Sequence, residues 1–239
     1  MLLGYSYEEI YLLFKKYANQ IKYLDFNNIL KGVYGLIFKR RIIINGLNSG
    51  KKLEKIINEA CKEKNIHNIN QIKMPIIVPS VNLHTGEIYC FCSKNMKKAN
   101  SNNITYINNS NIGKAVRSSC SYPVIFSPCK YNNLELVDGG LRENIPWKET
   151  KAMGAEKVIS VVFEKTLKNR NSDNILDVVS SSMDIVLREL YNCQIEGADC
   201  LLKIKTEAIS LLDMGKIDEL YEIGYREAKK NISKIKSMV

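Results

Sequence analysis

The stretch LELVDGGLRENIP, residues 134–146, sets one acidic side chain between a short apolar run and a pair of glycines. Leu134–Val137 has the length and apolar character of a β-strand, and Pro146 stands where a following helix would begin. Asp138 would then lie where the strand ends. In open α/β sheets, ligands and reactive side chains gather at such strand ends. The stretch therefore predicts an α/β fold with Asp138 as a candidate catalytic carboxylate.

The residues after Asp138 are suited to shaping a loop. Gly139 and Gly140 permit positive φ and let another backbone or a substrate approach closely. Asn144 can hydrogen-bond the loop backbone, and Pro146 fixes the turn into the next helix. The same pattern also suits an Asx turn, in which Asp138 bonds only the amides of its own loop. For an isolated D-G-G that structural reading is preferred, so the choice depends on the rest of the chain.

Strands and helices are expected to alternate along the chain. Strands are expected at residues 76–81, 87–92, 104–107, 134–137, 157–163 and 201–205. Helices are expected at residues 7–21, from 51, and at 112–119, 147–153, 175–193 and 216–236. Ser6 would cap the first helix, Ser49 the second and Ser110 the third, while Pro79 argues for a bulge or an edge position. The alternation predicts a single α/β domain, residues 1–239, with a largely parallel sheet flanked by helices.

Composition narrows the class of protein. No apolar run approaches the roughly 18 residues of a membrane-spanning helix, and MLLGYSYEEI lacks the basic region of a signal peptide. Seven scattered cysteines without a CxxC pair, beside only two histidines, argue against a zinc site. We expect reduced, mostly buried thiols in a cytoplasmic protein.

The net charge of +10 could attract an anionic membrane surface or a nucleic acid. Its basic clusters include Lys39–Arg41, Lys51–Lys52 and Lys97–Lys98. They are dispersed among Asn and Ile, which indicates a compositional bias rather than a binding stripe. No recognition-helix, RRM-like or arginine-rich pattern is present, so no nucleic-acid partner is expected.

Residues 115–163, AVRSSCSYPVIFSPCKYNNLELVDGGLRENIPWKETKAMGAEKVISVVF, closely resemble the patatin-like phospholipase family. In that family an A-V-x-A-S-x-x-x-P-x-x-F-x-P segment precedes D-G-G/A-x-x-x-N-x-P, a helix, G-A and an apolar strand. The matching positions are Ser119, Pro123, Phe126, Pro128, Asp138, Gly139, Gly140, Asn144, Pro146, Gly154 and Ala155. Ser118 stands where the family usually has alanine.

The resemblance extends over nearly the whole chain. Gly4–Ser6 with the following EEI is similar to the segment after the family's nucleophile helix. Residues 83–87, LHTGE, are similar to its D-L-x-T-G-E hairpin, with Asn82 in place of the usual aspartate. Residues 215–228 resemble its closing helix.

The resemblance implies a fold and a chemistry. It implies a three-layer α/β fold and a lipid or phospholipid ester substrate, hydrolysed at a Ser–Asp dyad beside a Gly-rich oxyanion loop. Asp138 would be the general base, with Gly139, Gly140, Asn144 and Pro146 shaping its loop. A carboxylate can serve as base when it is held near the hydroxyl and partly desolvated. No metal or cofactor is implied, and peripheral contact with a membrane surface is expected.

The nucleophile's G-x-S-x-G elbow does not occur in the 239 residues. The nearest spacing is Gly46–Gly50, whose serine, Ser49, suits a helix cap instead. By resemblance the serine would precede Met1, so the fold is expected to be N-terminally incomplete and the chain inactive alone. Two explanations stay open: an incomplete chain, or a real short product that acts as a non-catalytic lipid- or partner-binding scaffold. A missing strand would expose Val158–Phe163 and Leu134–Val137.

Overall fold

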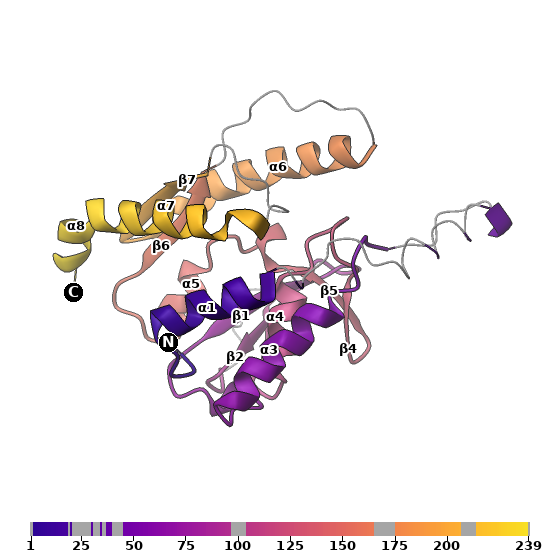
Figure 1. Cartoon of the computed structure of the whole chain (residues 1–239), viewed down its shortest axis with the longest axis horizontal. Coiled ribbons are helices and arrows are strands. Elements are labelled where there is room, and N and C mark those ends of the chain that lie inside the picture. Colours follow the sequence, from indigo (N-terminus) through magenta and orange to yellow (C-terminus); the bar gives the residue numbers. More distant parts are fainter. Residues whose placement is uncertain are drawn as a thin grey trace. The chain divides into compact units, whose positions relative to one another are not determined.

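The computed structural model shows an α/β protein whose chain divides into two compact units (Figure 1). It describes residues 2–18, 20, 30, 34, 37–39, 45–96, 104–164, 175–206 and 214–238. The first unit comprises residues 1–13 and 20–143, and the second comprises 14–19 and 144–239. The expected helix end at Ile21 lies outside the described residues, as do Arg40–Arg41 and Lys97–Lys98 of the basic clusters.

The first helix, α1 (Tyr7–Ala18), begins at the capping box that the sequence predicts. The N–H of Ser6 donates to Glu9 Oε2 at 2.7 Å, and the N–H of Glu9 donates to Ser6 Oγ at 3.2 Å. These two bonds satisfy amides that have no partner within the helix itself.

A five-stranded sheet forms the centre of the first unit, in the order β3-β2-β1-β5-β4. Its strands are β1 (Ile77–Asn82), β2 (Ile88–Cys92), β3 (Ile104–Ile107), β4 (Cys129–Tyr131) and β5 (Leu134–Asp138). The turn between β1 and β2 holds Gly86 at φ +70°, a conformation that glycine adopts without strain. Asn82 Oδ1 accepts from the N–H of His84 at 3.0 Å and closes the same turn.

The α/β class with helices flanking a sheet is confirmed, but the expectation of a largely parallel sheet is wrong for the described strands. Only β2–β3 here and β6–β7 in the second unit pair in parallel; β1–β2, β1–β5 and β4–β5 are antiparallel. The short turns after β1 and β4 require this, because a tight hairpin can join only antiparallel strands. Pro79 is likewise not at an edge: it lies in central β1, one residue beyond the stretch paired with β5.

Helices α3 (Lys51–Glu63) and α4 (Ile112–Ser119) pack against one face of this sheet. The buried side chains of this core come from both helices, from three strands and from the 3-10 turn at Ile69–Gln71 with the residue after it. They are Cys61, Ile69, Ile72, Phe91, Ile112, Ala115, Cys129 and Leu136. Ile88, Cys90 and Ile104 form a second cluster. Since Ile88 and Cys90 alternate with Phe91 along β2, the second cluster lies on the opposite face of the sheet.

Two of the expected helix caps are wrong. The N-cap of α3 is Gly50 rather than Ser49, at φ +67° and without a side-chain cap. The N-cap of α4 is Asn111 rather than Ser110, and Asn111 Oδ1 accepts from the N–H of Lys114 at 3.1 Å. Neighbouring polar residues compete for a cap, and the entry angle of the chain decides between them.

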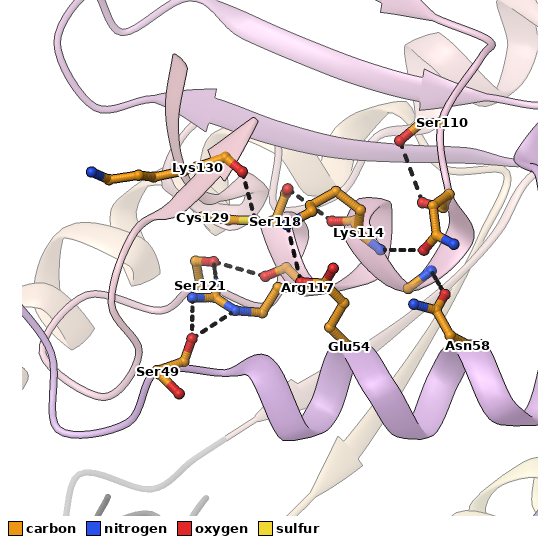
Figure 2. Close-up of polar contacts among 12 residues, drawn as sticks. Ser49, Glu54, Asn58, Ser110, Lys114, Arg117, Ser118, Ser121, Cys129 and Lys130 are labelled. Atoms are coloured by element: carbon orange, nitrogen blue, oxygen red, sulfur yellow. Dashed lines mark hydrogen bonds and ion pairs between the residues drawn. The ribbon is translucent and has the colours of Figure 1, made fainter. Parts of the chain in front are cut away.

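Polar contacts join α3 to α4 (Figure 2). Lys114 Nζ lies 3.2 Å from Glu54 Oε2, and the N–H of Gly113 donates to Asn58 Oδ1 at 3.0 Å. A Cβ on Gly113 would overlap the backbone and the Asn58 side chain of α3, so the close approach of the helices requires glycine.

The second unit contains a two-stranded parallel sheet of β6 (Ile159–Glu164) and β7 (Cys200–Lys205). Its helices are α5 (Trp147–Ala152), α6 (Ile175–Gln194), α7 (Ile217–Lys230) and α8 (Ile232–Lys236). The expected closing helix is thus divided at Asn231. Among the described helices none has the length and apolar character needed to cross a bilayer.

The strand β6, which the sequence predicts at residues 157–163, alternates between buried and exposed residues along most of its length. Ser160 and Val162 are buried, whereas Ile159, Val161 and Phe163 are exposed, Phe163 by 68%. Alternation follows from the two-residue repeat of a strand. One apolar face of this sheet is therefore open to solvent.

Candidate active site

Asp138 is the last residue of β5, at the strand end that the sequence predicts. It lies opposite Ser80 in the antiparallel ladder between β5 and β1. Its N–H donates to the carbonyl of Ser121 at 3.1 Å. The carboxylate is therefore attached to a backbone held from two sides, by β1 and by the segment after α4.

The carboxylate itself caps a short turn. Gly140 donates its N–H to Asp138 Oδ1 at 2.7 Å, at the start of the 3-10 helix Gly139–Leu141. This is the Asx-type contact that competes with a catalytic interpretation, and it occupies only one oxygen. Within the described ranges no hydrogen bond reaches Oδ2, which leaves that oxygen able to accept from a hydroxyl.

Gly139 and Gly140 do not use the positive φ angles that the sequence suggested for them. Neither is among the residues with positive φ, because both lie in the 3-10 turn. Gly139 is instead required by space, since a Cβ there would overlap the carbonyl of Pro79 on β1. The expected close backbone approach is thus correct for Gly139, and Gly140 contributes its N–H to the carboxylate.

The surroundings of Asp138 favour its protonated form. Burial raises the pKa of this carboxyl from 3.8 to about 6, against the opposite effect of the Gly140 hydrogen bond. A carboxylate with a pKa near 6 remains mostly ionised at neutral pH and accepts a proton more readily than an ordinary aspartate. The electrostatics suit a general base.

Cys120, the C-cap of α4, lies in the same electrostatic environment. Desolvation and then the negative charge of Asp138 raise the pKa of its thiol to about 11, and Arg117 opposes the rise. The thiol is therefore neutral at physiological pH and is a poor nucleophile. Neither Cys120 nor Arg117 was expected at this site; the signal was a charged residue inside an otherwise apolar and small stretch, AVRSSC.

Asn144 and Pro146 belong to the second unit, where the chain leads into α5. Gln194 Oε1, at the end of α6, accepts from the N–H groups of Asn144 and Ile145 at 2.9 and 3.0 Å. Pro146 is the N-cap of α5, as expected for a residue that starts the helix. The backbone of Asn144 is held by Gln194, a partner 50 residues away that no local pattern could indicate.

Metal-binding side chains do not gather in the parts of the chain that the structure describes. No group of three or more His, Cys, Asp or Glu residues is placed there to hold a metal ion. His84, in the β1–β2 turn, contacts Glu135 Oε2 through Nε2 at 3.2 Å. Glu135 lies near the start of β5, at the opposite end of the strand from Asp138.

Comparison with known proteins identifies related chains. The model of the family described as Patatin-like phospholipase matches residues 3–151. The lysophospholipase NTE1 of Meyerozyma guilliermondii is 30% identical over 136 residues, covering 46% of this chain and 10% of the relative. The lysophospholipase NTE1 of Candida albicans is 27% identical over 139 residues, covering 47% and 10%. The chain thus spans about a tenth of the length of these relatives.

Proposed function

The chain belongs to the patatin-like phospholipase family, and we propose on that basis that Asp138 is the general base of a Ser–Asp dyad that hydrolyses lipid acyl esters. The observation that supports this role most directly is the partly buried carboxylate at the end of β5, which has a raised pKa and whose Oδ2 accepts no hydrogen bond from the described residues. Gly139 and Gly140 shape its turn, and Asn144 and Pro146 shape the chain that follows. Residues 1–239 are proposed to be a single patatin-like domain.

The chemistry follows from the ionisation of Asp138. Its Oδ2 would take the proton of a serine hydroxyl while the serine oxygen bonds to the acyl carbonyl carbon. Asp138 would then return the proton to the departing alcohol, which leaves an acyl-serine. Water, deprotonated by the same carboxylate, would release the fatty acid and restore the serine. No histidine is needed, because the raised pKa lets the carboxylate exchange the proton directly.

This 239-residue polypeptide should not carry out the reaction alone. Its sequence contains no G-x-S-x-G elbow, the strand-to-helix turn that would expose the nucleophile serine in this family. Because the two relatives are lysophospholipases, a lysophospholipid is the first substrate to test. Contact with the surface of a lipid aggregate would deliver that substrate.

The test compares lysophospholipid hydrolysis by purified residues 1–239 with hydrolysis by a chimera. The chimera carries the Gly-rich loop and elbow of another family member fused before Met1. We expect no fatty-acid release from 1–239, release from the chimera, and a loss of at least about 100-fold on Asp138→Asn. Glu135→Gln, on the same strand, is the matched control and should keep the activity.

Two results would contradict the proposal. Hydrolysis by 1–239 that is lost on Asp138→Asn would show that the chain has its own nucleophile. If the folded, active chimera hydrolyses the substrate equally fast after Asp138→Asn, Asp138 is not the general base.

A second candidate function, binding to an anionic lipid surface without catalysis, has one observation in its favour. An open groove of about 500 Å³ on the first unit is lined by Lys51, Lys55, Lys62 and Lys114, with Glu54, Asn58 and Glu59. Four cations against two carboxylates give the groove a positive character. Flotation with phosphatidylserine vesicles at low and high salt tests it, and salt-independent binding, or none, would exclude it.

A further inference from the structure

Arg117 is a buried cation in α4, close to the turn that holds Asp138. Only 4% of its surface is exposed, and burial lowers the pKa of its guanidinium from the ordinary value. Among the described residues it forms no ion pair within 4.0 Å. A buried charge must be compensated, so neutral oxygens have to provide the hydrogen bonds.

The guanidinium contacts three segments of the first unit, and Figure 2 shows its contacts with Ser49 and Ser121. Nε and Nη2 donate to the carbonyl of Ser49 at 3.1 and 2.6 Å, and Nη2 also donates to the carbonyl of Ser127 at 2.7 Å. Nη1 donates to Ser121 Oγ. Gly50 completes the site, because a Cβ there would overlap the guanidinium. A planar fork of five donors suits such a set of acceptors, and a lysine does not.

Ser121 connects this cation to Asp138. Its side chain is fully buried, and its hydroxyl donates back to the carbonyl of Arg117 at 2.7 Å. Its own carbonyl accepts from the N–H of Asp138 at 3.1 Å. Arg117 therefore holds the residue that in turn holds the backbone of Asp138.

We propose that Arg117 is a positioning residue that fixes the Asp138 carboxylate through Ser121. The inference rests on the proposed role of Asp138 as the base, and it adds the residue that sets the orientation of that base. Arg117 contacts no reacting atom; it keeps the segment after α4 against β5, so that the Asp138 turn stays partly closed to water.

The experiment measures the pKa of the Asp138 carboxyl by carbon-13 NMR titration in Arg117→Met and Arg117→Lys. If Arg117 acts by position, both variants loosen the turn, water enters, and the pKa falls by about one pH unit toward the ordinary value. If it acts by charge, Arg117→Lys leaves the pKa unchanged and Arg117→Met raises it. This second result, an unchanged pKa in Arg117→Lys and a raised pKa in Arg117→Met, would overturn the proposal.

Two further variants keep the test decisive if an Arg117 variant fails to fold. Ser121→Ala removes only the linking hydroxyl and should also lower the pKa of Asp138. Ser118→Ala is the matched control, because this buried hydroxyl on α4 donates to the carbonyl of Lys114 at 2.9 Å and not to Ser121. A folded Ser121→Ala with an unchanged Asp138 pKa would overturn the proposal. The readout needs no hydrolysis, so its failure is distinct from failure of the proposed function.

Discussion

Gly139 lies so close to Pro79 that a Cβ at position 139 would overlap the carbonyl of Pro79 on β1. We therefore expect Gly139→Ala to reduce the free energy of unfolding by about 1–3 kcal/mol, since β1 and the Asp138 turn must separate to make room. Denaturant unfolding measures this change. Gly224→Ala, in α7 with nothing within 4 Å, is the control and should stabilise by up to about 1 kcal/mol. Equal effects of the two substitutions would contradict the crowding at Gly139.

The raised pKa of Asp138 predicts the pH dependence of stability. The folded protein binds this proton up to about pH 6, whereas the unfolded chain releases it near pH 3.8. Stability is therefore lost as the pH rises through this window, and the loss is fully present above pH 6. Asp138→Asn should remove this loss of stability. The variant should therefore be more stable than the original protein by up to about 3 kcal/mol at pH 7, with little difference between the two at pH 3. Urea unfolding at both pH values is the measurement; equal stability of the two proteins at pH 7 would contradict it.

Trp147, the single tryptophan, reports on the packing of the second unit. Gly197 lies against its indole, and a Cβ at position 197 would overlap the ring. Gly197→Ala should displace the indole toward water, shift its fluorescence emission to longer wavelength and cost about 1–3 kcal/mol. An unchanged emission spectrum would show that the ring is not held there. Gly154→Ala, with nothing within 4 Å of its Cβ but φ +104°, controls for backbone strain alone.

The exposed apolar face of β6 predicts self-association. Val161→Thr with Phe163→Thr should lower the concentration-dependent rise in mass seen by light scattering, because these side chains lie on the open face and threonine keeps the strand propensity. Val162→Thr, on the buried side of the same strand, should destabilise the fold without that benefit. If the double variant associates as strongly as the original chain, another surface is responsible.

Local patterns of the sequence predicted most of the elements of the fold. The short apolar run at residues 134–137 predicted β5 with Asp138 at its end, and the Ser6–Glu9 capping box predicted the start of α1. The pairing of β1 with β5 and the demand for glycine at position 139 depend on residues 54 to 60 positions apart along the chain, which no local pattern encodes. The role of Arg117 could not be predicted for the same reason. The carbonyls that accept its hydrogen bonds belong to the segments around Ser49 and Ser127, which come together only in the folded structure.

The contact between Arg117 and Ser49 joins parts of the first unit that lie far apart along the chain. The two residues are 68 positions apart, so the contact closes a longer loop, at a larger cost in chain entropy, than a hairpin such as β1–β2 does. The raised pKa of Asp138 arises from burial, so it belongs to the folded first unit, and we expect a chain in which that unit is open to carry an ordinary, solvated carboxylate at position 138.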